Sequence, residues 1–273
     1  MKIIRYADSN NDVGYAALQA DGSARRIEGN PFTRFRVQSR AADVRRTLAP
    51  VEPAMIWGIG INYRRHAEES KIKIPDHPIV FAKGPNAVQH PDEPIWLPGA
   101  LSSDQVDYEG ELAVVIGRTC KSVPRSRALE YVLGYTCAND VSARDWQITK
   151  CGGQWCRGKT FDSFAPLGPC LATVDEIPNP NRLRIRTEIN GEVLQDGNTD
   201  DMIFDVPALI AFLSASTTLA PGTVILTGTP HGVGMARTPP RWLQSGDRVT
   251  VEVEGIGRLS NPVSSEHIPS CTP

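Results

Sequence analysis

Acidic residues alternate at positions 107–111, in DYEGE, directly before the apolar run LAVVIG. If this segment is one strand, its two-residue period places Asp107, Glu109 and Glu111 on one face. A solvated strand face is the ordinary explanation of such a pattern. The same alternation, however, adds Ala113 and Val115 to that face, so the acids would lie at the mouth of a buried strand, where a cation offsets their repulsion. An all-oxygen cluster predicts Mg²⁺ or Mn²⁺, with Ca²⁺ as an ion that could replace them in a crystal, and disfavours zinc or copper.

A further acid, Asp140, follows another apolar run, YVLGYTCAN. The next residues, VSARDWQ, predict the start of a helix, so Asp140 would lie where a strand gives way to a helix. Helical spacing then puts Arg144 and Gln147 on the side of Asp140, since they follow it by four and seven residues. Asp140 could be a helix N-cap, a metal ligand, or both.

A histidine and a glutamate lie three residues apart in GINYRRHAEES, where an apolar run gives way to a polar, helical segment. On a helix, His66 and Glu69 would be neighbours, the spacing at which a carboxylate orients an imidazole that acts as a general base. A histidine in a polar helix is more often simply exposed to solvent. Spacing alone leaves both interpretations open.

Two glycine-bearing segments also fit an active site. Lys159 follows CGGQWCRG, and Thr229 lies in LTGTPHGVG after an apolar run. The second segment lacks the Gly-Lys-Ser/Thr ending of a phosphate loop and no clear helical pattern follows it, so nucleotide binding is not expected. Its backbone amides could instead hold a carboxylate. The sequence also has no Gly-x-Ser-x-Gly elbow, the usual signature of a serine hydrolase.

Short apolar runs separated by Gly, Pro and Asn predict a β-rich fold in which the elements carrying these residues are mostly strands. We expect a small N-terminal β subdomain over residues 1–52 and a catalytic body over 53–273. Within the body, Asn190-Gly191 predicts a tight hairpin turn, and Asp205 is expected to cap a helix that begins with Val206-Pro207. Because LAVVIG is apolar at successive positions, both faces of that strand should be buried.

Composition limits the partners of this 273-residue chain. With 29 basic and 31 acidic residues its net charge is −2, which favours a small solute and predicts neither nucleic acid nor membrane as a partner. The N-terminus has no signal-peptide core and no run is long enough to span a membrane, so we expect a cytoplasmic protein. Six scattered cysteines without Cys-x-x-Cys spacing predict free thiols, and Cys151 with Cys156 is a weak candidate for a metal or redox pair.

Taken together, the segments resemble the fumarylacetoacetate hydrolase family over roughly residues 57–263. The resemblance rests on ordered motifs, namely GINYRRHAEES, FAKGPNAV, VDYEGELAVVIG, YVLGYTCANDVSARDWQ, GKTFDSFAPLGP, NGEVLQDGNTDDMIF and LAPGTVILTGTPHGVG. It implies an α+β, β-rich fold, a mixed β-roll of the fumarylacetoacetate hydrolase type, and a homodimer. It also implies that Mg²⁺ or Mn²⁺ is bound by Glu109, Glu111 and Asp140.

By the same resemblance, His66 and Glu69 match the water-activating dyad of the family and Lys159 matches its lysine near the substrate. The positions that match residues contacting substrate, or lying just behind it, are Arg144, Gln147 and Thr229. The N-terminal 50 residues match only loosely, so nothing is carried over to them.

The implied reaction is hydrolysis of a C–C bond in a small 2,4-dioxo acid of the acylpyruvate or diketo-deoxy acid type. Relatives with the same metal site decarboxylate oxaloacetate or isomerise and decarboxylate hydroxymuconate-type acids, so those reactions stay open alternatives. A catalytically silent metal-binding domain is the non-enzyme alternative, although such a domain would normally have lost His66, Glu69 or Lys159. The substrate's tail is not determined, since weakly patterned loops at 71–77, 195–201 and 237–241 are expected to shape it.

Overall fold

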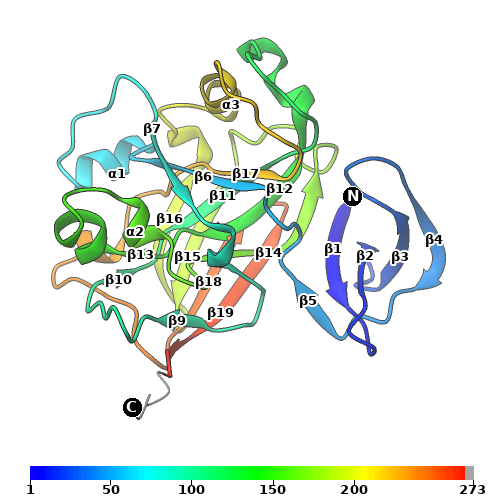
Figure 1. Cartoon of the computed structure of the whole chain (residues 1–273), viewed down its shortest axis with the longest axis horizontal. Coiled ribbons are helices and arrows are strands. Elements are labelled where there is room, and N and C mark those ends of the chain that lie inside the picture. The colour runs from blue at the N-terminus through cyan, green and yellow to red at the C-terminus, as the bar shows by residue number, and fades with distance from the viewer. Residues whose placement is uncertain (268–273) are drawn as a thin grey trace, which may run out of the picture.

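Two sheets form the framework of the chain in the computed structural model, which describes residues 1–267 (Figure 1). The larger has 12 strands, in the order β4-β3-β2-β1-β14-β12-β11-β17-β6-β7, with β5 paired to β1 and β8 to β14. Its strands are β1 (Lys2–Ala7), β2 (Val13–Leu18), β3 (Ala24–Gly29), β4 (Phe35–Ala41), β5 (Arg46–Leu48), β6 (Met55–Gly60), β7 (Ile79–Lys83), β8 (Val88–Gln89), β11 (Gly110–Ile116), β12 (Val132–Asn139), β14 (Ala165–Thr173) and β17 (Thr223–Leu226).

The smaller sheet has five strands in the order β16-β15-β18-β19-β9, and a separate pair is formed by β10 and β13. These strands are β9 (Ile95–Leu97), β10 (Val106–Asp107), β13 (Ser142–Ala143), β15 (Arg184–Ile189), β16 (Glu192–Asn198), β18 (Arg248–Val253) and β19 (Gly257–Ser265). The helices are short: α1 (Arg64–Glu69), α2 (Cys156–Lys159), α3 (Val206–Ser214), the 3₁₀ turns η1 (Pro85–Ala87), η2 (Arg125–Tyr131), η4 (Thr199–Asp201) and η5 (Gly234–Ala236), and the π-helical η3 (Trp146–Lys150).

The core lies on both sides of β11, whose seven residues are all buried. Leu112 and Val114 pack in one apolar cluster with residues of the smaller sheet such as Val251, while Ala113 and Val115 belong to a second cluster. The expectation that both faces of this strand are buried is confirmed.

Strand directions bring four chain segments to one end of the large sheet. β11 runs antiparallel to both β12 and β17, and β17 runs parallel to β6. The start of β11 therefore lies beside the ends of β12, β17 and β6. Each of these strands leads into a segment that carries predicted site residues.

Two local predictions are confirmed. Asn190 and Gly191 have φ values of 53° and 86° in the turn between β15 and β16, as a tight hairpin requires. Asp205 accepts a hydrogen bond from the backbone N of Ala208 at 2.9 Å and so caps α3, with Pro207 in the first turn.

The N-terminal strands lie to the side of the body in Figure 1, as a meander that continues the large sheet. β1 pairs antiparallel with β14, with Lys2 opposite Ala172 and Ile3 opposite Leu171. The expected boundary at residue 52 therefore separates strands that share one hydrogen-bonded sheet, and the division into two domains stays a proposal.

Two details of the predicted strands and helices are wrong. The acidic segment is not one strand, because β10 ends at Asp107 and β11 begins at Gly110. The helix expected from Asp140 starts later, because β13 pairs with β10 and keeps the chain extended through Ala143. Long-range pairing overrides the local helical pattern at this point.

Candidate metal centre and catalytic cavity

Three carboxylates meet where β11 begins and β12 ends. Ligand oxygens of Glu109, Glu111 and Asp140 lie within 4.8 Å of one another, and all three residues are buried. The strand register explains the arrangement, because Gly110 pairs with Asn139 and the backbone N of Asp140 donates to the Glu109 carbonyl at 2.8 Å. The structure thus brings the three predicted metal ligands together.

Asp107 does not join them. Its carboxylate accepts hydrogen bonds from the backbone N of Gly234 at 2.7 Å and from Arg144 Nε at 2.9 Å. The break between β10 and β11 ends the two-residue alternation that would have aligned it with Glu109 and Glu111. The expectation that Asp107 lies on the same face as these two acids is therefore wrong.

Two buried lysines hold the carboxylate cluster. Lys159 Nζ lies 2.5 Å from Glu109 Oε2 and 2.7 Å from Asp140 Oδ2. Lys83, at the end of β7, binds the other oxygen of Asp140 and donates to the Val141 carbonyl at 3.0 Å. The sequence analysis did not single out Lys83, and its only signal was a lysine at the end of an apolar strand in FAKGP.

The electrostatics of the cluster fit a divalent cation. Burial, with Asp140 and Glu109 beside it, raises the pKa of Glu111 well above its usual range. Burial alone would also raise the pKa of Glu109, but Arg144 and Lys159 lower it well below its usual range. Burial lowers the Lys83 pKa to about 8 against the opposing effect of Asp140. A hard cation would stabilise the ionised form of Glu111 beside the other two carboxylates. The oxygen donors suit Mg²⁺ or Mn²⁺.

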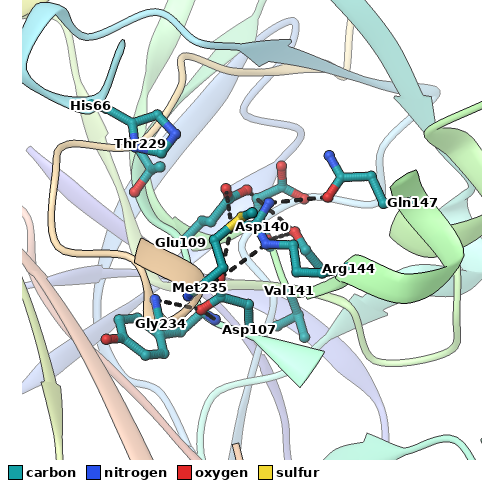
Figure 2. Close-up of polar contacts among 12 residues, drawn as sticks. His66, Asp107, Glu109, Asp140, Val141, Arg144, Gln147, Thr229, Gly234 and Met235 are labelled. Carbon is teal, nitrogen blue, oxygen red and sulfur yellow. Dashed lines mark hydrogen bonds and ion pairs between the residues drawn. The ribbon is translucent and has the colours of Figure 1, made fainter. Parts of the chain in front are cut away.

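Arg144 and Gln147 lie beside the carboxylates, as Figure 2 shows, although Asp140 does not cap a helix. Arg144 donates from Nη2 to Glu109 at 2.7 Å and from Nη1 to the Gln147 side-chain oxygen at 3.0 Å. The N-cap role belongs to Asp145, whose side chain accepts from the backbone N of Trp146. The predicted convergence of Asp140, Arg144 and Gln147 occurs, but through an extended segment followed by a π-helical turn.

The histidine on α1 is buried, so the solvent-exposed alternative does not apply. His66 is 5% exposed, and its Nδ1 lies 2.7 Å from Glu69 Oε1. Glu69 Oε2 in turn accepts a hydrogen bond from the backbone N of Gly232 at 2.8 Å. Glu69 therefore holds the ring at Nδ1 and leaves Nε2 as the ring nitrogen for proton transfer.

The glycine-rich segment after β17 binds carboxylates of the chain itself. Its backbone amides at Gly228, Gly232 and Gly234 donate to Glu111, Glu69 and Asp107, over 2.7, 2.8 and 2.7 Å. The backbone amides therefore hold carboxylates, as expected, and these carboxylates are side chains of the chain itself.

Thr229, in the same segment, is held from both sides. Its hydroxyl donates to the Gly110 carbonyl at 3.0 Å and accepts from Gln195 Nε2 at 2.7 Å. Gln195 also accepts from the backbone N of Gly110 at 2.9 Å, so it braces the start of β11. Gln195 was expected only at the edge of a substrate-shaping loop, and its bracing contact had no signal in the sequence.

Comparison with known proteins places this geometry in a family. The fumarylacetoacetate (FAA) hydrolase C-terminal profile matches residues 55–264. The chain is 48% identical over 224 residues to a fumarylacetoacetate hydrolase domain-containing protein 2 homolog of Dictyostelium discoideum, covering 79% of this chain and 73% of that protein. It belongs to the fumarylacetoacetate hydrolase family. Family membership identifies it as an enzyme and supports a divalent metal at the three carboxylates.

Two further relatives of this fumarylacetoacetate hydrolase family member are named for an activity. A mitochondrial oxaloacetate tautomerase of Xenopus laevis is 44% identical over 253 residues, which cover 92% of this chain and 76% of that protein. The crystal structure of a 5-carboxymethyl-2-hydroxymuconate delta-isomerase from Mycobacterium smegmatis is 40% identical, with a TM-score of 0.85, and the match covers 97% of this chain and 100% of that one. The predicted family fold is confirmed.

The predicted residues line one cavity of about 440 Å³. Its charged end contains the three carboxylates with Arg144 and Lys159, and His66, Glu69 and Thr229 also line it. The rest of the lining is apolar and comprises Ile61, Ile72, Phe81, Ile148, Trp155, Met235 and Ala236. Of the three loops expected to shape the substrate's tail, 71–77 contributes Ile72, whereas 195–201 and 237–241 contribute no lining residue.

The cysteine pair and the possibility of a membrane span are two further points that the sequence raises. Cys151 and Cys156 are free thiols, as predicted, and neither lines the cavity, while Cys271 lies outside the described residues. Between residues 1 and 267, no helix is long and apolar enough to cross a membrane.

Proposed function

We propose that this enzyme moves a proton at the carbon next to the keto group of a small 2-oxo acid, as a divalent-metal-dependent tautomerase or isomerase. The observation that carries the proposal is that the buried His66, held by Glu69, lines the same cavity as the three carboxylates. A positioned base beside an electrophilic centre is what abstraction of a proton α to a carbonyl requires.

Each residue has a defined task in this proposal. When bound at Glu109, Glu111 and Asp140, Mg²⁺ or Mn²⁺ would supply Lewis-acid polarisation of the substrate's carboxylate and keto oxygens. His66 Nε2 takes the proton from the carbon next to the keto group and delivers it to the keto oxygen in a tautomerisation, or to another carbon of the conjugated chain in an isomerisation, while Glu69 stabilises the charged ring. Lys159 adds positive charge beside the developing anion, and Arg144 and Gln147 bind substrate oxygens. Thr229, whose hydroxyl already donates to the Gly110 carbonyl, contacts the substrate as part of the cavity wall.

The names of two relatives support proton transfer. Oxaloacetate tautomerase and hydroxymuconate delta-isomerase both describe proton movement next to a keto or enol group rather than addition of water. Proton transfer also requires fewer groups than hydrolysis. For these reasons it replaces C–C hydrolysis as our first candidate.

Hydrolysis of a C–C bond in a 2,4-dioxo acid is the second candidate, favoured by the size and lining of the cavity. About 440 Å³ leaves room for a substrate longer than oxaloacetate together with a water molecule. The apolar lining suits an uncharged acyl tail. In this reaction His66 would activate water instead of removing a substrate proton.

Proton NMR in D₂O tests the first candidate. The enzyme with Mg²⁺ should exchange the C3 protons of pyruvate, 2-oxohexanoate or oxaloacetate faster than Mg²⁺ alone, and excess EDTA should stop the exchange. Acetylpyruvate in the same tube tests the second candidate through release of acetate. Absence of metal-dependent C3 exchange for every 2-oxo acid would refute the first candidate.

We further propose that the chain forms a homodimer through the catalytic body, that residues 1–52 are a separate subdomain, and that the protein is cytoplasmic. Light scattering at micromolar concentration tests the first, where a particle of 29.8 kDa, the mass of one chain, would contradict it. Limited proteolysis near residue 52 tests the second. A mitochondrial location is the alternative to a cytoplasmic one, because similar relatives are named as mitochondrial proteins.

A further inference from the structure

Asp107 is a fully buried carboxylate beside the metal-binding acids that is not one of them. Its two oxygens accept from the backbone N of Gly234 at 2.7 Å, from the backbone N of Met235 at 3.1 Å and from Arg144 Nε at 2.9 Å. A buried charge with this many partners fixes the groups that bind it.

The guanidinium of Arg144 is oriented by these contacts. Nε binds Asp107, Nη2 binds Glu109 at 2.7 Å and Nη1 binds Gln147 at 3.0 Å. Because the fork is planar and carries five N–H donors, anchoring it at Nε and Nη2 fixes where Nη1 points. Arg144 lines the cavity, so its remaining Nη1 hydrogen is available to a ligand there.

The same carboxylate holds part of the cavity wall. Gly234 and Met235 open the η5 turn, and the side chains of Met235 and Ala236 line the cavity. Gly234 can approach Asp107 closely because it has no Cβ, which would otherwise meet the Arg241 carbonyl and the Asp107 carboxylate. Figure 2 shows Asp107 between this turn and Arg144.

We propose that Asp107 is a positioning residue that aims Arg144 at the carboxylate of the substrate and ties it to the η5 turn of the wall. The inference rests on the proposed function, since it assigns Arg144 an anionic oxygen of a 2-oxo acid as ligand. Without Asp107, Arg144 would retain Glu109 as a partner but lose the contact that fixes its plane. Ligand affinity would fall while the metal-binding acids stayed intact.

A double-mutant cycle over Asp107→Asn and Arg144→Lys tests the proposal with Mg²⁺-loaded protein and oxalate as the probe, measured by titration calorimetry. Asp107→Asn should weaken oxalate binding about tenfold, as loss of a positioning partner does, with Mg²⁺ affinity within about threefold of the parent. The double variant should bind oxalate no more weakly than Arg144→Lys alone, because Asp107 acts through Arg144. In the steady state, KM for a 2-oxo acid should rise more than kcat falls.

The matched control is Asp247→Asn, which removes another buried carboxylate paired with an arginine, Arg241, at 2.8 Å and outside the cavity. It should lower stability but leave oxalate affinity unchanged. If Asp107→Asn does not fold, Asp107→Glu, which keeps the charge but displaces the fork, replaces it in the cycle. Parental oxalate affinity in the Asp107 variant, or additive effects in the cycle, would overturn the proposal. Coupled oxalate affinities without turnover of any 2-oxo acid would refute the proposed function and leave the positioning role standing.

Discussion

The charged and the apolar parts of the cavity lining are built in opposite ways. At the charged end, Glu111 is 1% exposed, and Glu109 and Asp140 are each held by two cations. At the apolar end, Ile72 and Ile148 are 45% and 47% exposed. They lie in a loop after α1 and in the π-helical turn η3 rather than on central strands.

The difference suggests that chemistry and specificity are separated in this molecule. Every ionised group at the charged end is buried with partners, so removing one group leaves others unpaired at a high energetic cost. Ile72 and Ile148 are aliphatic and exposed, so they make no directional contacts, and most surface substitutions of that kind cost little stability. We expect the charged end to tolerate almost no change and the apolar end to vary with the substrate's tail.

The largest effect should follow from changing a metal-binding acid. Glu111→Gln is the most informative variant, because within residues 1–267 no ion pair joins Glu111 to a cation, whereas Asp140→Ala would remove the carboxylate that pairs with the buried Lys83. Glu111→Gln should abolish metal-dependent C3 exchange and keep the fold, since Gln can still accept from Gly228. Circular dichroism checks the fold, and full activity in excess chelator would contradict a metal mechanism.

His66→Ala should reduce turnover by about 10² to 10⁴-fold, the usual contribution of a positioned base, with Mg²⁺ affinity nearly unchanged. Glu69→Gln should be milder, because it keeps a hydrogen-bonding partner for the ring while it loses the charge and one of the two acceptor oxygens. Initial rates of C3 exchange and of acetylpyruvate cleavage by the same variant measure the effect. A His66→Ala rate within about threefold of the parent in both assays would exclude His66 as the base.

A smaller effect should separate substrates by their tails. The lining cations Arg144 and Lys159 already bind acids, so in the described part of the chain no lining arginine or lysine is unpaired for a second carboxylate. We expect kcat/KM for C3 exchange of 2-oxohexanoate to exceed that of 2-oxoadipate by about tenfold, about 1.4 kcal/mol. Ile148→Lys should narrow this ratio.

Val174→Lys is the control for that variant, because Val174 is exposed and lies outside the cavity. It should leave the ratio unchanged. Equal rates for the two acids with the parent enzyme would show that the apolar end does not select the tail.

The smallest predicted effect is on stability. Burial, with Asp140 and Glu109 beside it, raises the pKa of Glu111, so protonated Glu111 stabilises the folded state. This stabilisation is fully present below the pKa of Glu111 in the unfolded chain. It is lost as pH rises through the higher pKa of Glu111 in the folded protein. A bound cation replaces the proton, so stabilisation by saturating Mg²⁺ should grow between pH 5 and 7.5, below the Lys83 pKa of about 8. Each pKa unit corresponds to about 1.4 kcal/mol and roughly 2–4 °C in Tm. Differential scanning calorimetry measures this, and in Glu111→Gln the increase with pH should disappear.

Features that depend on near neighbours follow from the sequence alone. The turn at Asn190-Gly191 and the cap at Asp205 follow from local backbone preferences, and His66 with Glu69 follows from helical spacing. Ordered motifs along the chain were enough to indicate the family and the three metal-binding acids.

The groups that hold those acids depend instead on long-range contacts in the fold. Lys83 and Asp140 are 57 positions apart, and Asp107 and Gly234 are 127 apart, so no local period relates them. The break between β10 and β11 and the pairing of β10 with β13 are also long-range, and they turn Asp107 away from the three predicted metal ligands and toward Arg144. A buried charge takes whichever partners the fold brings to it, and strand order and register, rather than spacing along the chain, decide which partners those are.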